Sequence, residues 1–449
     1  MMNLIYDKIM PRAMKISQNK YLSSVSDGFM MLMPVLIIGS MFSLLNNLAI
    51  NSYQNFIITT GLKNFFDIPN KVTNDILSIY AVFFIAYAFA KRLNRDQGVA
   101  GMIALFSFLA VTPFGNTVVT IQNFLTNNNL TVVEGVEIPA ASFLPMEWLG
   151  AKGLFVAIFV ALISTKIYDF LLTKNLMIKM PDSVPPTIGK SFAGLMPGFV
   201  SIIFFMIVDK LVALIPIESV TGIQSGIYSL IQAPIENFLG NNIWSFIFAA
   251  FLAQLLWSLG IHGMTAIILP IFYPLWTSLN NANVDALNAG TSVYELPNIL
   301  NRTFWQVYTI GGGSGLTLGL CLYLVFFAKS SQYKTLGKLS VVANFCGINE
   351  PVIFGLPMVL NPVMIIPFVL SPIVVSVVAY LLTVINILPR LTTIIPLGTP
   401  VIMSGFISTA SGSWRVALFQ VFVILASALM YLPFIKILDK KAVLEETAA

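Results

Sequence analysis

Residues 346–362 read CGINEPVIFGLPMVLNP, an apolar stretch that carries one carboxylate, Glu350, and three prolines. A run this apolar is typical of a membrane segment, yet a carboxylate at the centre of a bilayer is unfavourable by about 3 kcal/mol. The prolines remove backbone hydrogen-bond donors, so the stretch cannot form one unbroken helix. Because acidic side chains within membrane segments are usually functional, the stretch predicts a broken helix that brings Glu350 into a functional site.

The composition of the whole chain is that of a membrane protein. Of its 449 residues, 57% are hydrophobic and only 10% are charged, whereas soluble domains have about 25% charged residues. The net charge of +5 comes from basic residues spread over short loops, as orientation in a membrane requires, so we expect no nucleic-acid partner. With two cysteines and one histidine, we expect neither a disulfide framework nor a metal site or other cofactor.

Apolar runs long enough to cross a bilayer recur along the chain, since a spanning helix needs about 20 such residues. A further run, 263–280, is broken by Pro270 and Pro274, and residues 281–301 are expected to form a polar loop. Two more apolar regions, 340–361 and 392–414, are interrupted by Gly, Ser, Thr or Pro. Irregular backbone at membrane depth is tolerated only where protein or a wet cavity surrounds it, so we interpret both regions as re-entrant hairpins. The sequence thus predicts an all-α polytopic membrane protein with about ten transmembrane helices and two re-entrant hairpins. The clear candidate spans are 29–50, 73–91, 98–115, 149–172, 193–217, 243–262, 303–329, 362–388 and 415–437.

Basic residues predict the orientation of these spans, because cytoplasmic loops are enriched in Lys and Arg. The N-terminus carries Lys8, Arg12, Lys15 and Lys20, and is therefore expected to be cytoplasmic. The loop 116–147 contains three Glu and neither Lys nor Arg, which predicts an external position.

The chain is expected to divide near residue 218. Residues 1–217 hold five regular spans, and 218–242 form an amphipathic connector that could lie flat on the membrane. Residues 243–437 hold all the broken helices, which mark the binding sites of transporters. Residues 438–449 are expected to be a short, frayed cytoplasmic tail.

His262 is the second candidate for the site. It is the single histidine of the chain and ends an apolar helix between Gly260 and Gly263. A lone histidine is often a structural core residue, but a histidine at a glycine-flanked break could also donate a hydrogen bond or act as a general base.

Two tryptophans are candidates for substrate contact. Trp257 precedes His262 by five residues, and Trp414 lies at the end of the second hairpin. Sugars stack on indole rings while the indole N–H finds a polar partner, although tryptophans also gather at membrane interfaces. Together with Glu350, His262 and Asn349, they form the predicted substrate-binding set, in which Glu350 and His262 are the catalytic candidates.

The stretch GINEPVIFGLPMVLNP resembles the signature of the membrane-embedded enzyme IIC of the bacterial phosphotransferase system. Asn349 before Glu350 favours the lactose/cellobiose/chitobiose branch of that family. The segments ISQNKYLSSVSDGFMMLMPVLIIGSMF, WSLGIHGM and SWRVALFQ are similar to the same family, so the resemblance covers essentially the whole chain.

The resemblance implies a homodimer in the bacterial plasma membrane with an elevator-type architecture. The first half would form the dimer scaffold, and the second half would carry the sugar across the membrane. It also implies phosphorylation of a β-linked disaccharide, of cellobiose or diacetylchitobiose type, on its 6-hydroxyl by a separate cytoplasmic phospho-IIB. IIA would act indirectly by recharging IIB. Because no stretch of this sequence resembles IIB or IIA, both are expected to come from other chains, and the chain would take part in phosphotransfer only with IIB.

Within this resemblance, Glu350 and His262 match the two sugar-site residues near the reacting hydroxyl, and either could be the base. Two other functions remain open from the residues alone. A proton-coupled secondary sugar transporter would use Glu350 as its proton carrier. A sugar sensor would bind the sugar without accumulating it.

Overall fold

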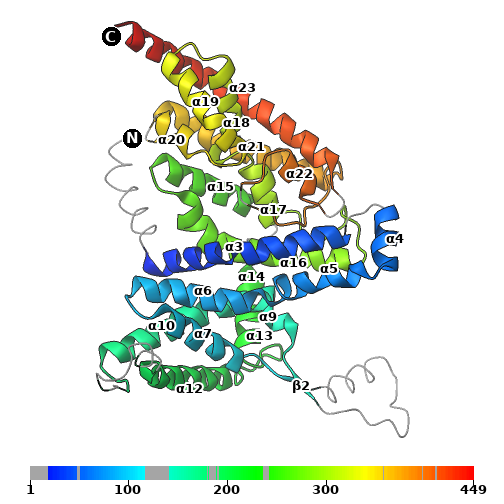
Figure 1. Cartoon of the computed structure of the whole chain (residues 1–449), viewed down its shortest axis with the longest axis vertical. Coiled ribbons are helices and arrows are strands. Elements are labelled where there is room, and N and C mark those ends of the chain that lie inside the picture. Colours follow the sequence, from blue (N-terminus) through cyan, green and yellow to red (C-terminus); the bar gives the residue numbers. More distant parts are fainter. Residues whose placement is uncertain are drawn as a thin grey trace. The chain divides into compact units, whose positions relative to one another are not determined.

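The computed structural model describes residues 19–47, 51–116, 141–178, 181, 189, 192–235, 242–356, 358–359, 361–396, 398–409 and 412–448. Within these ranges the chain is mainly helical (Figure 1), which confirms the predicted helical class. The basic residues Lys8, Arg12 and Lys15, most of the loop 116–147 and the proline at position 357 lie outside the described residues. The chain forms two compact units. The smaller contains Asp27–Leu32 and Asp75–Pro234, and the larger contains Ile235–Ala449 together with other N-terminal segments.

Four helices form the body of the smaller unit. Helices α6, α7 and α10 pack against one another, and α12 packs on α7 and α10 (Figure 1). A two-residue antiparallel ladder, β1 with β2, pairs Gly115 with Phe143. The elements are η2 (Asn74–Ile76), α6 (Leu77–Arg92), α7 (Gln97–Ala110), β1 (Gly115–Asn116), β2 (Ser142–Phe143), α9 (Met146–Leu149), η3 (Ala151–Gly153), α10 (Leu154–Thr173), α12 (Leu195–Val212), α13 (Ile223–Ile227), η4 (Tyr228–Gln232) and α14 (Ala233–Ile235), the last ending at the unit boundary.

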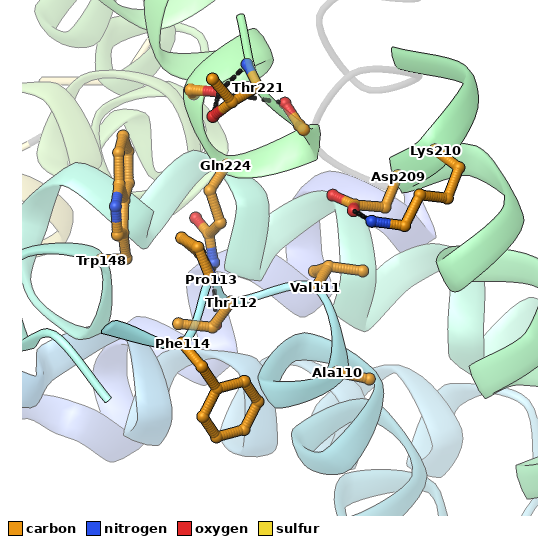
Figure 2. Close-up of a pocket in the computed structure, with 12 residues that line it drawn as sticks. Ala110, Val111, Thr112, Pro113, Phe114, Trp148, Asp209, Lys210, Thr221 and Gln224 are labelled. Atoms are coloured by element: carbon orange, nitrogen blue, oxygen red, sulfur yellow. Dashed lines mark hydrogen bonds and ion pairs between the residues drawn. The ribbon is translucent and has the colours of Figure 1, made fainter. Parts of the chain in front are cut away.

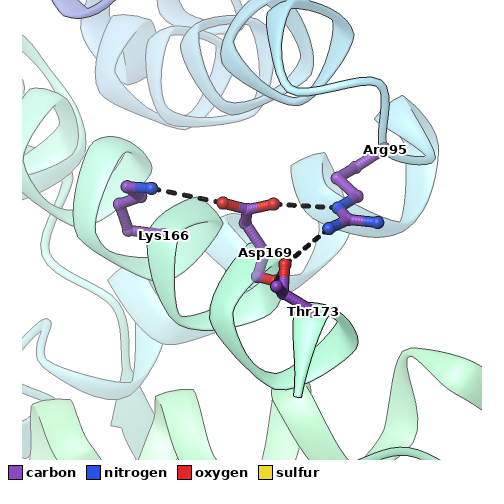
Figure 3. Close-up of polar contacts among 4 residues, drawn as sticks. All are labelled: Arg95, Lys166, Asp169 and Thr173. Atoms are coloured by element: carbon purple, nitrogen blue, oxygen red, sulfur yellow. Dashed lines mark hydrogen bonds and ion pairs between the residues drawn. The ribbon is translucent and has the colours of Figure 1, made fainter. Parts of the chain in front are cut away.

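An ion pair and a hydrogen bond from Arg95 attach the turn between α6 and α7 to α10. Arg95 donates from Nε to Oδ1 of Asp169 at 2.9 Å and from a terminal nitrogen to Oγ1 of Thr173 at 2.7 Å (Figure 3). Lys166 donates to the other carboxylate oxygen at 3.2 Å. One carboxylate thus receives two cations, and this arrangement fixes the turn against α10.

The larger unit contains the remaining helices, although residues Asp27–Leu32 of α3 (Lys20–Asn47) belong to the smaller unit. The predicted polar loop 281–301 is wrong at its start, because α16 continues to Asn288. The break predicted within 263–280 is also absent: the π-helical segment η6 leads directly into α16, with Pro274 in the first turn, where a missing N–H is tolerated. The elements are α3 (Lys20–Asn47), α4 (Asn51–Thr59), α5 (Leu62–Lys71), α15 (Ile243–Ser258), η6 (Met264–Phe272), α16 (Tyr273–Asn288), α17 (Arg302–Phe304), η7 (Trp305–Thr309), η8 (Ser314–Leu316), α18 (Leu318–Phe326), α19 (Ser331–Phe345), α20 (Glu350–Gly355), α21 (Pro362–Val384), α22 (Met403–Ile407) and α23 (Trp414–Ala448).

Among the described residues, four helices are long and apolar enough to cross a membrane. The predicted span 303–329 is instead a pair of helical pieces bent by 47°, which could count as a fifth. The bend lies at a glycine run where Gly315 has a φ of 74°, a left-handed conformation that glycine adopts at little steric penalty. The four helices are Ala151–Thr173, Leu195–Val212, Pro362–Val384 and Trp414–Thr447.

Two separate hydrophobic clusters hold the larger unit together. The first core cluster joins α15, η6, α16, η7 and α21, and includes Phe246, Trp276 and Trp305. The second core cluster joins α18, α19, α20 and the C-terminal half of α23, and includes Tyr333 and Ala442. Figure 1 shows α18, α19, α20 and the end of α23 lying together. Trp257 of α15 belongs to the second core cluster although its neighbour Leu256 belongs to the first, so the two clusters adjoin at the end of α15.

The prediction that the C-terminal tail is frayed is wrong. Helix α23 runs without interruption from Trp414 to Ala448 (Figure 1), so residues 438–448 continue the last long helix. Its end is stabilised by packing, since Ala442 belongs to the second core cluster. Sequence position alone suggested fraying, but the tertiary contacts of this end determine its order.

Residues 392–414 double back on themselves, as a hairpin must. The N–H groups of Thr392 and Thr393 donate to the carbonyl of Ser408 at 3.0 and 3.1 Å. Gln420 of α23 fixes the tip, because its Oε1 accepts from the N–H groups of Ile402 and Gly405 at 2.7 and 2.8 Å. Ile402 has a φ of 78°, which is strained for a β-branched residue.

Candidate functional site

His262 follows a helix end that its sequence encodes. Helix α15 ends at Ser258, and Gly260 adopts a φ of 81°. The N–H of Gly260 donates to the carbonyl of Trp257, and that of Ile261 donates to the carbonyl of Leu256, each at 2.9 Å. This is a Schellman cap, which uses a left-handed glycine to end a helix. The chain therefore turns sharply, and His262 is the first residue after the cap.

Glu350 follows a second turn of the same type. Helix α19 ends at Phe345, and Gly347 has a φ of 80°. The N–H of Gly347 donates to Asn344, and the N–H of Ile348 donates to Ala343, each at 2.9 Å. The cap reverses the chain, and the six-residue helix α20 begins with Glu350. The predicted break in the helix is thus present, and its physical cause is the left-handed glycine followed by Pro351 in the first turn of α20.

Trp257 lies beside both turns. Its ring centroid is 4.3 Å from that of His262 and 6.5 Å from that of Phe354. Phe354 follows Glu350 by four residues on α20, so both side chains lie on one face of that helix. The Glu350 carboxylate is also close enough to His262 to act on it electrostatically. The structure therefore brings together Trp257, His262 and Glu350, which the sequence had singled out separately.

Two polar atoms in this cluster are buried and have no protein partner. Among the described residues, none hydrogen-bonds Oε2 of Glu350 or Nε1 of Trp257. Leaving a buried polar atom unsatisfied is unfavourable by about 1–3 kcal/mol. A ligand rich in hydroxyl groups can satisfy both an unsatisfied acceptor and an unsatisfied donor.

The hydrogen bonding of His262 defines which ring nitrogen can donate. Nδ1 accepts from the N–H of Thr265 at 3.4 Å, a long hydrogen bond. In the neutral ring an accepting Nδ1 leaves the hydrogen on Nε2. The His262 side chain is exposed, so its Nε2–H can reach a ligand.

Asn349 has a different environment from that predicted for a sugar ligand. It is 3% exposed, and its Nδ2 donates to the carbonyl of Ser314 at 2.6 Å and to Oγ1 of Thr317 at 2.8 Å. A Cβ on Gly313 would overlap the Asn349 side chain. Asn349 thus fastens the Glu350 turn to the glycine run before α18, while its role as a sugar ligand stays a prediction.

Trp414 lies at the first residue of α23 and is 65% exposed. The Arg415 guanidinium is 6.0 Å from its ring, and Arg415 also donates to the hydroxyl of Tyr294 at 3.3 Å. None of the described contacts of Trp414 involves His262 or Glu350, so the structure does not join it to the cluster around Trp257. Its role in sugar binding stays a prediction.

Sequence reasoning missed Phe354 and Thr265. Phe354 is 65% exposed and could stack on a sugar, and the signal for it was its spacing of four residues from Glu350. Thr265 orients the His262 ring by donating its backbone N–H to Nδ1. Every residue except proline has such an N–H, so the residue type gave no signal.

A polar cavity of about 260 Å³ lies in the smaller unit (Figure 2). Its polar lining includes Asp209, Lys210 and Gln224. Asp209 accepts from the N–H of Ile223 at 2.8 Å, and Gln224 donates to Oγ1 of Thr112 at 3.1 Å. These groups connect α12 and the end of α7 to the start of α13, which is a structural role.

Comparisons with known proteins identify the family of the chain. The family model "Phosphotransferase system, EIIC" matches residues 26–372. The chain is 35% identical to the cellobiose-specific EIIC component of Geobacillus stearothermophilus, covering 99% of this chain and 96% of the relative. It is also 35% identical to the oligo-beta-mannoside-specific EIIC component of Bacillus subtilis, covering 98% and 96%.

A solved structure of an EIIC protein is also similar to this chain. The crystal structure of ChbC, the IIC component of the N,N'-diacetylchitobiose-specific phosphotransferase system, superposes with a TM-score of 0.88 at 32% identity, covering 99% of each chain. The predictions of the family and of an integral membrane permease are confirmed. This chain belongs to the EIIC family of the phosphotransferase system.

Proposed function

We propose that this chain binds a β-linked disaccharide of the cellobiose or diacetylchitobiose type and carries it inward for phosphorylation at its 6-hydroxyl by a separate phospho-IIB. The observation that carries the proposal is the pair of capped helix ends that present His262 and Glu350 beside Trp257. The names of the cellobiose-specific and diacetylchitobiose-specific relatives support the substrate class.

In this proposal the buried Oε2 of Glu350 accepts a hydrogen bond from a sugar hydroxyl, and Nε2 of His262 donates one. The rings of Trp257 and Phe354 contact the apolar faces of the sugar. Asn349 holds the Glu350 turn in place, and Trp414 extends the binding surface if the sugar reaches the second hairpin.

Phosphoryl transfer depends mainly on positioning and charge stabilisation. The oxygen of the 6-hydroxyl attacks the phosphorus held on the IIB cysteine, the P–S bond breaks, and the hydroxyl proton passes to Glu350 or His262. The sugar leaves as a phosphate ester, whose charge prevents its return across the membrane. IIA recharges IIB and therefore acts on this chain only indirectly.

The assembly that we propose is a homodimer with about ten spans and two re-entrant hairpins per subunit and a cytoplasmic N-terminus. The first 217 residues form the scaffold, residues 218–242 the connector, and residues 243–437 the elevator-type transport domain. The lack of Lys and Arg in 116–147 supports the orientation.

The proposal is tested by uptake of radiolabelled disaccharides into vesicles loaded with phosphoenolpyruvate and the soluble carriers, with IIB present or left out. We expect sugar phosphate to accumulate only with IIB, and a panel of cellobiose, diacetylchitobiose and lactose to identify the substrate.

A proton-coupled secondary transporter is the second candidate, and the observation in its favour is that no described residue hydrogen-bonds Oε2 of Glu350. In the same experiment it would give accumulation of free sugar without IIB, abolished by an uncoupler. Saturable binding without any accumulation would indicate a sugar sensor. Either outcome would overturn the phosphotransfer proposal.

A further inference from the structure

The C-terminal end of α23 holds the beginning of α19 through two carboxylates. Asp439, which is 4% exposed, accepts from the N–H groups of Lys329 and Ser330, each at 2.9 Å. Glu446 accepts from Oγ of Ser330 at 2.6 Å and from the N–H groups of Ser331 and Gln332 at 3.0 and 2.9 Å. Asp439 and Glu446 are seven residues apart and thus share one helix face.

These contacts satisfy groups that α19 cannot satisfy by itself. The first N–H groups of a helix have no partner within the helix, and the N-terminus of a helix attracts negative charge. Ser330 caps α19 internally by accepting from the N–H of Tyr333 at 3.2 Å. The two carboxylates of α23 accept hydrogen bonds from the other N–H groups at this end. These N–H groups therefore bond to another helix and not to water.

Helix α19 connects this contact to the site. It has 15 residues, which at a rise of 1.5 Å per residue give about 22 Å. Its far end is the capped turn of Gly347 that presents Glu350. A Cβ on Gly337 would meet the backbone of α18 at Val325 at 2.8 Å, so α19 packs closely on its neighbour along its length.

The second core cluster packs α19, α20 and the end of α23 against one another. Ala442 of α23 and Tyr333 of α19 belong to the same cluster as Val352 and Ile353, which follow Glu350 on α20. The His262 turn is packed by both clusters, since Leu256 and Ile261 lie in the first core cluster and Trp257 lies in the second. The relative position of His262 and Glu350 therefore depends on how the second cluster is held.

We propose that residues 439–446 are a positioning element of the sugar site. Through Asp439 and Glu446 they fix the start of α19, and α19 in turn fixes the Glu350 turn opposite His262. The effect on sugar affinity rests on the function proposed above, whereas the effect on the turn does not.

Cys346 provides a direct reporter, because it is the last residue before Gly347 and is half-buried, whereas Cys321, the other cysteine of the chain, is fully buried. The experiment uses the full-length protein in lipid nanodiscs. The rate of N-ethylmaleimide labelling at Cys346 is followed by peptide mass spectrometry, in parallel with the melting temperature and the affinity for cellobiose and diacetylchitobiose.

The test variants are Glu446→Ala and Glu446→Gln, and the matched control is Glu445→Ala. Glu445 is adjacent and exposed, and its one described ion pair is with Lys441 at 3.7 Å. Loss of a helix cap corresponds to roughly a five-fold change in a local equilibrium, so we expect Glu446→Ala to raise the labelling rate of Cys346 about five-fold. Glu446→Gln, which keeps an acceptor, should recover part of the effect, and Glu445→Ala should match the wild type.

The outcomes separate the two proposals. Faster labelling of Cys346 with weaker sugar affinity supports the positioning role. A lower melting temperature with unchanged labelling and unchanged affinity would overturn it, because Glu446 would then stabilise α19 without reaching the turn. If the wild type binds neither sugar but labelling still responds to Glu446→Ala, the positioning of the turn holds and the proposed substrate class fails.

Discussion

Two turns of this protein have the same backbone hydrogen bonds, but the charged side chains that they present differ in their hydrogen-bond partners. After α6, Asn94 has a φ of 55° and the N–H of Arg95 donates to the carbonyl of Ala90 at 2.9 Å. After α19, Gly347 and Ile348 repeat this Schellman cap. In the first turn the charged side chain of Arg95 has a carboxylate and a hydroxyl as partners (Figure 3). In the second, Oε2 of Glu350 is buried and has no hydrogen-bond partner among the described residues.

The difference shows how a charge that supports the fold can be told from one that is available to a ligand. The Arg95 turn uses its charge to attach the turn to α10. The Glu350 turn is held instead by Asn349 and by the packing of α19 and α20. Because those contacts hold the backbone, the carboxylate itself can remain unsatisfied until a substrate arrives.

The largest effect is expected from Glu350→Gln. Hydrogen bonds to charged groups contribute up to about 3 kcal/mol, so this substitution should weaken disaccharide binding by about 100-fold. Binding is measured by isothermal titration in detergent or nanodiscs. Glu295→Gln, an exposed acid in the same unit, is the matched control and should bind as the wild type does. Unchanged affinity in Glu350→Gln would remove Glu350 from the sugar site.

His262 is expected to give the next effect, mainly on phosphotransfer. A general acid–base group contributes about 100-fold or more to a rate, so His262→Ala should reduce IIB-dependent sugar phosphorylation by about that factor. His262→Gln can place an N–H where Nε2 donates but cannot act as a base. If His262→Gln restores both binding and phosphorylation, His262 serves as a donor and Glu350 is left as the base. If both variants behave as the wild type, His262 takes no part in sugar binding or phosphotransfer.

Gly347→Ala tests the turn itself. A Cβ at this position meets no atom within 4 Å, so the penalty comes only from the left-handed conformation and should be about 1–2 kcal/mol. We expect a lower melting temperature and weaker sugar binding. Gly347→Asn should recover most of the loss, since Asn94 occupies the equivalent position in the other turn. Equal losses in the two variants would argue against a backbone effect.

The smallest effect is expected from Arg95→Ala. Arg95 and Asp169 form a partly exposed pair, and pairs of this kind contribute about 1 kcal/mol or less. The melting temperature should fall slightly and by less at high salt, while disaccharide affinity stays unchanged. A loss of affinity comparable with that of Glu350→Gln would contradict the division between a structural turn and a functional turn.

The local features of both site turns could be read from the sequence. Gly347, Pro351 and the single acid in an apolar stretch indicated a broken helix and a functional carboxylate, because backbone freedom and charge burial are properties of individual residues. The same reasoning located His262 at a glycine-flanked helix end. Where the reasoning failed, as for the α23 tail and the start of 281–301, packing against distant segments extended a helix that local composition did not require.

The sequence by itself determined that this protein lies in a membrane, that the helix before Glu350 is broken, and to which family it belongs, since apolar composition and the GINEP motif are present in the chain before it folds. The tertiary structure decided that Trp257 lies between His262 and Phe354, that Asn349 holds the Glu350 turn, and that Glu446 holds the start of α19. These contacts join residues far apart in the chain, and which of them meet depends on how the two core clusters pack and not on any local preference.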